Sequence, residues 1–201
     1  MTKIKFCGLF QPCDIETVNE IQPEYVGFVF DINSKRYITL KKAKQLKQML
    51  FSNIKVVGVF SDESIEVIAK LMNDNVIDIA QLHGNEDENY IRELRKKTNK
   101  CIIKAFCIKS KQDVINAKKS SADYILLDAG KGCGKKFNWQ LIEDIKRPYF
   151  LAGGLDLSNI NDAIKKLHPF VLDVSSGIET NGKKDKTKMV AFASIVRKEK
   201  K

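Results

Sequence analysis

Short apolar runs alternate with amphipathic segments along the whole chain. The runs are rich in Val, Ile and Phe, and most of them lack polar alternation, which is typical of strands buried on both faces of a parallel sheet. Eight such strands are predicted, over residues 4–7, 25–30, 55–60, 78–82, 101–106, 123–128, 149–152 and 170–174.

The segments between these runs have the period of amphipathic helices. Ala43, Leu46 and Met49, for example, fall on one side of a helix. Strands begin about every 25 residues, which is the length of a strand followed by a crossover helix. The predicted helices cover residues 14–21, 40–50, 64–72, 87–97, 111–119, 139–145, 157–167 and 185–196, and the first is the weakest.

Eight strands in strict alternation with eight helices predict an α/β fold, a (β/α)8 TIM barrel that forms a single domain over residues 1–201. The alternative is a doubly wound open sheet. The first strand-to-helix turn lacks the G-x-G-x-x-G pattern that many such sheets carry. No linker or low-complexity segment suggests a domain boundary.

Two of the predicted strands end in loops suited to an anion. The last strand stops at Ser175, Ser176 and Gly177, and the strand before it runs into Gly153 and Gly154. Successive backbone N–H groups in such loops converge on a phosphate. In (β/α)8 barrels the loops after strands 7 and 8 often form a phosphate site. Either loop alone is also compatible with an ordinary turn, but the pair favours phosphate binding.

Composition excludes several classes of protein. The chain has 201 residues, of which 43% are hydrophobic, enough for a sizeable core. No apolar run approaches the roughly 18 residues that span a membrane. The N-terminus is predicted to form a strand and lacks a signal peptide, so we expect a cytoplasmic protein.

The five cysteines are dispersed without a C-x-x-C, and His83 and His168 lack ligand spacing, so neither a disulfide framework nor a metal site is expected.

The formal net charge is +10. Most of this charge comes from lysines spread over predicted helices, which is typical of a solvated surface. Nucleic-acid binding would require basic residues clustered on one face with a recognisable module, and none is found, so no nucleic-acid partner is expected. The positive field would still draw in a small anionic substrate.

Catalytic groups of a parallel barrel lie at the carboxyl ends of its strands. Cys7 ends the first predicted strand, Arg36 follows the second, Gln81 and His83 surround the end of the fourth, and Asp128 ends the sixth. Together with the two loops they would place a thiol, a guanidinium, an imidazole, a carboxyl group and an anion site in one pocket.

These motifs, in this order, closely resemble those of the phosphoribosylanthranilate isomerase family of tryptophan biosynthesis. The resemblance covers nearly the whole chain, and the ordered set is specific although each motif alone is weak. The matching segments are residues 5–9, 27–30, 34–38, 81–84, 127–128, 132–139, 153–155, 173–179 and 182–185.

The resemblance implies an Amadori isomerisation of N-(5-phosphoribosyl)anthranilate that uses neither metal nor cofactor. It implies that Asp128 is the general acid, which protonates the ribose ring oxygen, and that Cys7 is the general base, which removes the C2 proton. Arg36 would pair with the anthranilate carboxylate, a planar partner that suits a guanidinium. Members of the family occur as monomers and as homodimers.

The same resemblance implies a phosphate site formed by Gly153, Gly154, Ser175, Ser176 and Gly177. Two further positions would contribute less directly: Gln81 and His83 would shape the wall of the pocket, although a structural His83 is equally compatible with the sequence. Asp173, on a buried strand, needs polar partners and is expected to support the phosphate loop.

The role of Cys7 as a general base sets a requirement for its pKa. A free thiol with a pKa near 8.5 is only about 3% thiolate at pH 7. We therefore expect the surroundings of Cys7 to depress its pKa.

The chain departs from the family pattern at a few positions. Asn138 stands where the family has Asp, and Cys133 occupies the place of a small residue in the glycine-rich loop. Neither change removes a proposed catalytic group, and Asn138 is expected to cap the following helix.

Two other functions remain open at this point. One is another phosphate-binding barrel enzyme of the tryptophan or histidine pathways, either a synthase, which would need an additional Lys and Glu at strand ends, or a sugar isomerase, which would have Asp in place of Cys7. The other is a non-catalytic barrel that binds a polyanion, for which duplex binding should depend steeply on salt.

Overall fold

Eight parallel strands close on themselves in sequence order, and β8 pairs with β1 to complete the barrel. The structure is a computed structural model that describes residues 2–128, 138–142 and 145–198. Closure confirms the predicted (β/α)8 barrel and excludes the open sheet. The strands are β1 Lys3–Cys7, β2 Tyr25–Val29, β3 Lys55–Phe60, β4 Ile79–Leu82, β5 Cys101–Cys107, β6 Tyr124–Asp128, β7 Tyr149–Leu151 and β8 Val171–Val174.

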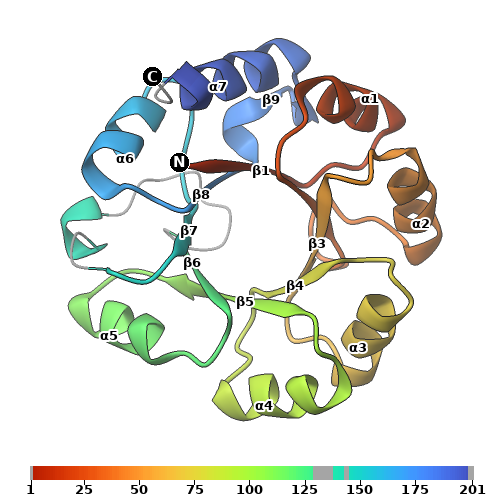
Figure 1. Ribbon diagram of the computed structural model, residues 1–201, viewed down its shortest axis with the longest axis vertical. Helices are drawn as coiled ribbons and strands as arrows, with labels where there is room; N and C mark the ends of the chain where they lie inside the picture. The colour runs from red at the N-terminus through yellow and green to blue at the C-terminus, as the bar shows by residue number, and fades with distance from the viewer. Residues whose placement is uncertain (1, 129–137, 143–144, 199–201) are drawn as a thin grey trace.

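Helices surround the barrel as an outer ring (Figure 1). The sequence marks the start of several of them, because the side chains of Thr39, Ser64, Asp87 and Ser110 each accept a hydrogen bond from a backbone N–H in the first turn. The α-helices are α1 Pro12–Ile21, α2 Leu40–Met49, α3 Ile65–Asn73, α4 Glu88–Lys97, α5 Lys111–Lys119, α6 Ile160–Leu167 and α7 Lys186–Lys198.

The prediction of a regular helix over residues 139–145 is wrong for the part that is described. Trp139–Ile142 forms a short 3-10 helix, η1. Asn138 does cap it, since its Oδ1 accepts a hydrogen bond from the Gln140 N–H. Pro148 leaves little room for a longer helix because it disfavours the helical conformation at Arg147.

The chain after β8 contains small elements that the apolar pattern did not predict. A 3-10 turn, η2 Ser176–Ile178, is followed by two short antiparallel strands, β9 Glu179–Thr180 and β10 Lys183–Lys184. These strands are polar and two residues long, so they lack the alternation on which strand prediction depends. They lie beside the carboxyl end of the barrel and carry charged groups toward it.

Two apolar layers hold the fold together. Val57, Leu126 and Phe150 belong to a cluster of buried residues that fills the barrel. Their neighbours along the strands, such as Val56 and Leu127, belong to a second cluster between the strands and the helices. Alternation along each strand therefore buries both faces, as predicted for a parallel sheet.

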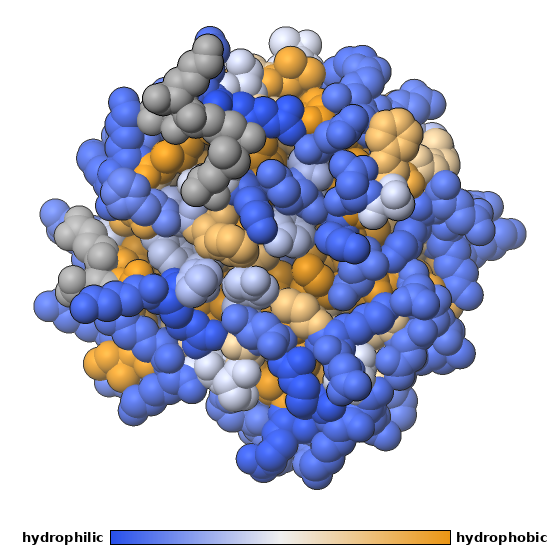
Figure 2. All heavy atoms as spheres, in the orientation of Figure 1, coloured by the Kyte–Doolittle hydropathy of each residue, from blue (hydrophilic) through white to orange (hydrophobic). Residues whose placement is uncertain are grey.

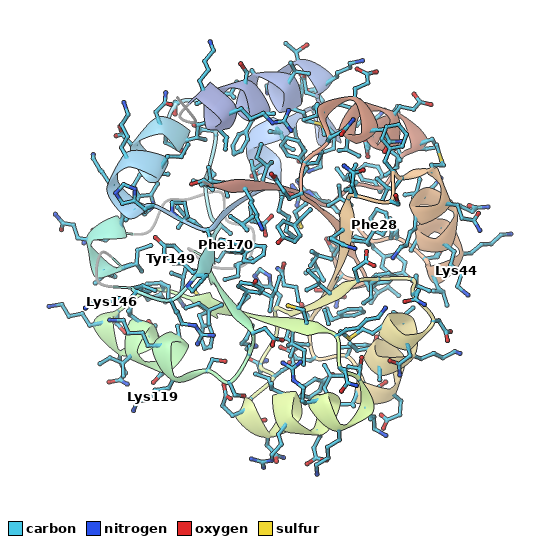
Figure 3. All side chains as sticks on the ribbon, viewed as in Figure 1. Phe28, Lys44, Lys119, Lys146, Tyr149 and Phe170 are labelled. Carbon is cyan, nitrogen blue, oxygen red and sulfur yellow. The ribbon has the colours of Figure 1, made fainter. Side chains whose placement is uncertain are left out.

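The lysines lie mostly on the outer rim. Lys44, Lys119 and Lys146 point outward from the ring in Figure 3, and the periphery of the face in Figure 2 is largely hydrophilic. This distribution agrees with a solvated surface. Over the described ranges, no helix is both long and apolar enough to cross a membrane.

Candidate functional site

One cavity of about 360 Å³ opens at the carboxyl ends of the strands and collects nearly all the predicted site residues. Its lining includes Cys7, Arg36, Gln81, His83, Asp128, Gly153, Gly154, Asp173, Ser175 and Ser176. Gly177 is the one predicted residue outside this lining. The glycine-rich segment 132–137, which includes Cys133, lies outside the described residues.

The two predicted phosphate loops touch each other. Gly153 and Gly154 have φ angles of 86° and 64°, in the left-handed region that favours glycine. A Cβ on Gly177 would lie 1.9 Å from the carbonyl oxygen of Leu155. The absence of a side chain at Gly177 therefore allows the loop after β8 to pack directly on the loop after β7.

This close approach predicts a strong effect for Gly177→Ala. The new methyl group must push the two loops apart, and misplacement by about 1 Å can lower the rate about 10²-fold. We expect kcat/KM to fall by about that factor, with most of the change in KM because the phosphate contacts are disturbed. Steady-state kinetics checks this, with Gly182→Asn as the control.

The control is matched by geometry. Gly182 has a φ of 75°, which Asn tolerates, and a Cβ there meets nothing within 4 Å. An equal loss of activity in both variants would contradict the assignment, because the loss would then not depend on contact between the phosphate loops.

Cys7 ends β1 and lies against β2. A Cβ on Gly27 would come within 2.6 Å of its Sγ, so the glycine makes room for the thiol. Burial raises the pKa of the Cys7 thiol, and the neighbouring positive charges of Lys5 and Lys184 offset this only in part. The expectation of a depressed pKa is therefore wrong, because desolvation of the thiolate is the largest influence on Cys7.

A buried lysine that the sequence analysis gave no role lies directly below Cys7. Lys5 is completely buried, and its Nζ donates to Asp173 Oδ2 at 2.7 Å and to Gln81 Oε1 at 2.9 Å. Lys5 and Asp173 are also register partners on β1 and β8. Asp173 thus has the polar partner that its burial requires, while its Oδ1 has no hydrogen-bond partner among the described residues.

Gln81 and His83 extend from this ion pair to Asp128. Gln81 Nε2 and His83 Nδ1 are 2.9 Å apart, and His83 Nε2 lies 3.4 Å from Asp128 Oδ2. Asp128 is 8% exposed at the end of β6. Gln81 and His83 therefore do more than shape the wall of the pocket, because they connect the interior of the barrel to the carboxyl group of Asp128.

Arg36 is held by a carboxylate that the sequence analysis also left without a role. Its Nε and Nη2 donate to Glu179 Oε1 and Oε2 at 2.6 and 2.8 Å, as a bidentate pair. Lys184 donates to the same Glu179 Oε1 at 2.7 Å and to the Ser175 carbonyl oxygen at 3.0 Å. The β9–β10 hairpin thus ties Arg36 to the phosphate loop.

This arrangement predicts the pH dependence of one stabilising interaction. Burial acts to raise the pKa of Glu179, but hydrogen bonds from Arg36 and Lys184 dominate and lower it to about 2, from an ordinary value of 4.5. A depressed carboxylate pKa stabilises the folded state above pH 4.5, and this contribution is lost as the pH falls toward 2.

Urea unfolding of the parent and of Glu179→Gln, from pH 7 to pH 3, tests this dependence. The parent should be more stable at pH 7, and its advantage should shrink below about pH 4.5. An advantage that stays constant or grows on acidification would show that the carboxylate does not stabilise the fold through its charge.

Within the described ranges, no group of three or more His, Cys, Asp or Glu is placed to hold a metal ion. The cavity brings together a carboxyl group, a thiol, a guanidinium and the two predicted phosphate loops.

Comparison with known proteins gives a consistent result. The family model for N-(5'-phosphoribosyl)anthranilate isomerase matches residues 4–194. A relative of that name from Endomicrobium trichonymphae is 42% identical over 202 residues, covering 98% of this chain and 99% of the relative. The phosphoribosyl anthranilate isomerase of Thermotoga maritima has a similar structure, with a TM-score of 0.89 and 33% identity, covering 98% of this chain and all of that one.

Two further structures bear on the site and on assembly. One, with a TM-score of 0.88 and 33% identity, is a phosphoribosyl anthranilate isomerase in complex with reduced 1-(o-carboxyphenylamino)-1-deoxyribulose 5-phosphate. The other, with the same two values, is a monomeric form of the Thermotoga maritima protein, which is described as dimeric. The match over almost the full chain shows that this protein belongs to the N-(5'-phosphoribosyl)anthranilate isomerase family.

Proposed function

We propose that this chain converts N-(5-phosphoribosyl)anthranilate into 1-(2-carboxyphenylamino)-1-deoxyribulose 5-phosphate, an Amadori rearrangement of tryptophan biosynthesis. The observation that carries the proposal is that Cys7, Arg36, Asp128 and both phosphate loops line one cavity. The phosphate and carboxylate groups of this substrate match the loops and the guanidinium. The reaction needs one acid and one base, which the cavity supplies.

Asp128 acts first, as the general acid. Its carboxyl group gives a proton to the ribose ring oxygen, and the bond between C1 and that oxygen breaks. The nitrogen lone pair forms the C1=N bond of an iminium ion, so the ring opens without any co-reactant. A positioned acid contributes roughly 10²–10⁴-fold to the rate.

Cys7 then acts as the general base. The thiolate takes the C2 proton, which the adjacent iminium acidifies, and the C–H electrons form the C1=C2 bond while the C1=N electrons return to nitrogen. The resulting enolamine tautomerises to the ketone. Because burial raises the pKa of Cys7, the enzyme depends on the neighbouring positive charges of Lys5 and Lys184 to stabilise the thiolate.

Arg36 and the two loops orient the substrate between these groups. Glu179 engages Nε and Nη2 of Arg36, so within the described part of the chain Nη1 keeps its donors for the anthranilate carboxylate. The Ser176 hydroxyl and the backbone N–H groups of the two loops offer donors to the phosphate, whereas the Ser175 hydroxyl donates to the Cys7 carbonyl oxygen at 3.0 Å. Binding energy from these two anchors orients the reacting carbons.

The remaining expectations about partners follow from this substrate. The ligand is a small phosphorylated anion, and the proposed reaction requires neither metal nor cofactor. We expect no nucleic-acid or membrane partner, a cytoplasmic location, and either a monomer or a homodimer.

Complementation tests the function and separates it from its alternatives. The chain should restore growth without tryptophan to a bacterial strain that lacks its own phosphoribosylanthranilate isomerase, and a Cys7→Ala variant should not. A matched strain lacking the histidine-pathway sugar isomerase tests the second substrate. Rescue of the histidine strain alone would overturn the proposal in favour of that isomerase, and rescue of neither strain by a well-expressed chain would contradict an isomerase function.

A further inference from the structure

Lys5 is a charged side chain enclosed in the barrel, on the same face of β1 as Cys7. Side chains two residues apart on a strand point the same way. Ile4 and Phe6 belong to the apolar layer beneath the helices, so Lys5 and Cys7 face the interior. Branched apolar residues dominate the interior of most such barrels, which makes a fully buried lysine in this position unusual.

The lysine remains an ammonium ion in this position. Burial acts to lower the pKa of Lys5, but Asp173 and Cys7 more than offset it, and the net pKa lies above the ordinary value of 10.5. An ammonium group has three N–H donors and no acceptor. Asp173 and Gln81 accept from two of them. The Cys7 thiol lies two residues further along the same face of β1, where the positive charge of Lys5 favours its thiolate.

Because Lys5 can only donate, it fixes the direction of the hydrogen bonds that lead to Asp128. Gln81 must present Oε1 to the lysine, which turns its Nε2 donor toward His83. His83 Nδ1 must then accept and cannot carry a proton. The proton of the neutral imidazole therefore lies on Nε2, the nitrogen 3.4 Å from Asp128 Oδ2.

We propose that Lys5 is a positioning residue that serves both ends of the site: its ammonium group stabilises the thiolate of Cys7, and through Gln81 it holds His83 with the Nε2 proton toward Asp128. The proposal rests on the function proposed above, since it assigns the base to Cys7 and the acid to Asp128. A purely structural lysine would need only its carboxylate partner. Lys5 also lies on the same face of β1 as the thiol, and it begins the series of polar contacts through Gln81 and His83 that ends at Asp128.

The ionisation of Cys7 reflects several charges, which differ in sign. Lys5 on β1 and Lys184 on β10 favour the thiolate, and Asp173 on β8 disfavours it. Arg36 also interacts electrostatically with the thiol. Removing Lys5 and removing Asp173 should therefore move the titration of Cys7 in opposite directions.

The first test follows the alkylation of Cys7 by iodoacetamide against pH, with the Cys7 peptide quantified by mass spectrometry. This readout does not require isomerase activity. In Lys5→Met, we expect the midpoint to rise by at least one pH unit, so that the thiolate fraction at pH 7 falls about tenfold. In Asp173→Asn the midpoint should fall. Unchanged midpoints in folded variants would overturn the proposal.

Two further variants separate this effect from loss of stability. Lys104 is another buried lysine, paired to Glu86 at 2.9 Å and absent from the cavity lining. Lys104→Met should destabilise the fold similarly without moving the Cys7 midpoint. The double variant Lys5→Met, Asp173→Asn avoids an unpaired buried carboxylate, and its midpoint should remain above that of the parent. An equal shift in Lys104→Met would reduce the role of Lys5 to a structural one.

Nitrogen-15 NMR of the imidazoles tests the second half of the proposal. The chain has only two histidines, so His83 can be assigned with His83→Asn. The parent should show the tautomer protonated on Nε2, and Gln81→Leu or Lys5→Met should lose that preference. An imidazole ring of His83 that is protonated on Nδ1 in the parent would contradict the proposed order of hydrogen bonds from Lys5 through Gln81. Parent turnover reports separately on the proposed function, so the two can fail independently.

Discussion

Replacing Cys7 with alanine is expected to lower kcat/KM by at least 10²-fold and to leave the fold intact. The side chain is small, lies at the end of β1 and lines the cavity, so its removal leaves the apolar core unchanged. The variant loses the group that we propose accepts the C2 proton, and a general base contributes roughly 10²–10⁴-fold. Because the loss falls on the chemical step, kcat should drop while KM changes little.

Cys13→Ala provides the matched control. Cys13 is an exposed thiol on α1 and does not line the cavity. Its removal should leave kcat/KM unchanged within about twofold. Activity of Cys7→Ala within tenfold of the parent would leave the family assignment in place but exclude Cys7 as the base.

Replacing Asp128 with asparagine is expected to lower kcat/KM by a similar factor, for a different chemical reason. The asparagine amide has nearly the same shape as the carboxyl group, and its oxygen can still accept a hydrogen bond from His83 Nε2. The series of polar contacts that begins at Lys5 therefore still ends at residue 128. The amide cannot deliver a proton to the ribose ring oxygen. We therefore expect kcat to fall 10²-fold or more, with KM within about threefold of the parent.

Binding of the reduced product analogue, measured by calorimetry, separates the acid from a binding role. The analogue is already ring-opened, so Asp128→Asn should bind it about as tightly as the parent. A large loss of binding, or a rise in KM with an unchanged kcat, would show that Asp128 serves to hold the substrate rather than to protonate it.

The barrel was predictable because each strand carries its own signal. Runs such as Val56 and Val57 in β3 are apolar on both faces, and each of the eight barrel strands lies within one residue of its predicted bounds. The 3-10 helix at Trp139 and the hairpin at Glu179 were missed for a common reason. Both are short, and their conformations depend on contacts with the rest of the fold rather than on an apolar period.

The site was predictable at the level of its motifs but not of its internal connections. Cys7, Arg36 and Asp128 were found because they stand at strand ends in a recognisable order. Lys5 and Glu179 stood within the same motifs and received no role. Lys5 pairs with a residue 168 positions away, which only closure of the barrel brings together. A lysine inside an apolar strand, two residues before the thiol, was the available signal.

The raised pKa of Cys7 is the main change that the structure makes to the chemical picture. From the sequence, only the needs of the thiol itself could be considered, and these predicted a depressed pKa for Cys7. In the fold, burial disfavours the thiolate, and the neighbouring cations only partly offset this effect. The balance among Lys5, Lys184 and Asp173 therefore sets how much thiolate is available.

Steady-state turnover of freshly prepared N-(5-phosphoribosyl)anthranilate by the purified chain tests the central claim most directly. Loss of the fluorescence of the anthranilate substrate gives the rate, and the product can be confirmed by mass spectrometry. We expect saturable turnover in metal-free buffer containing a chelator, with no added cofactor. A folded, chelator-treated chain that leaves this substrate unchanged would contradict the proposed isomerisation.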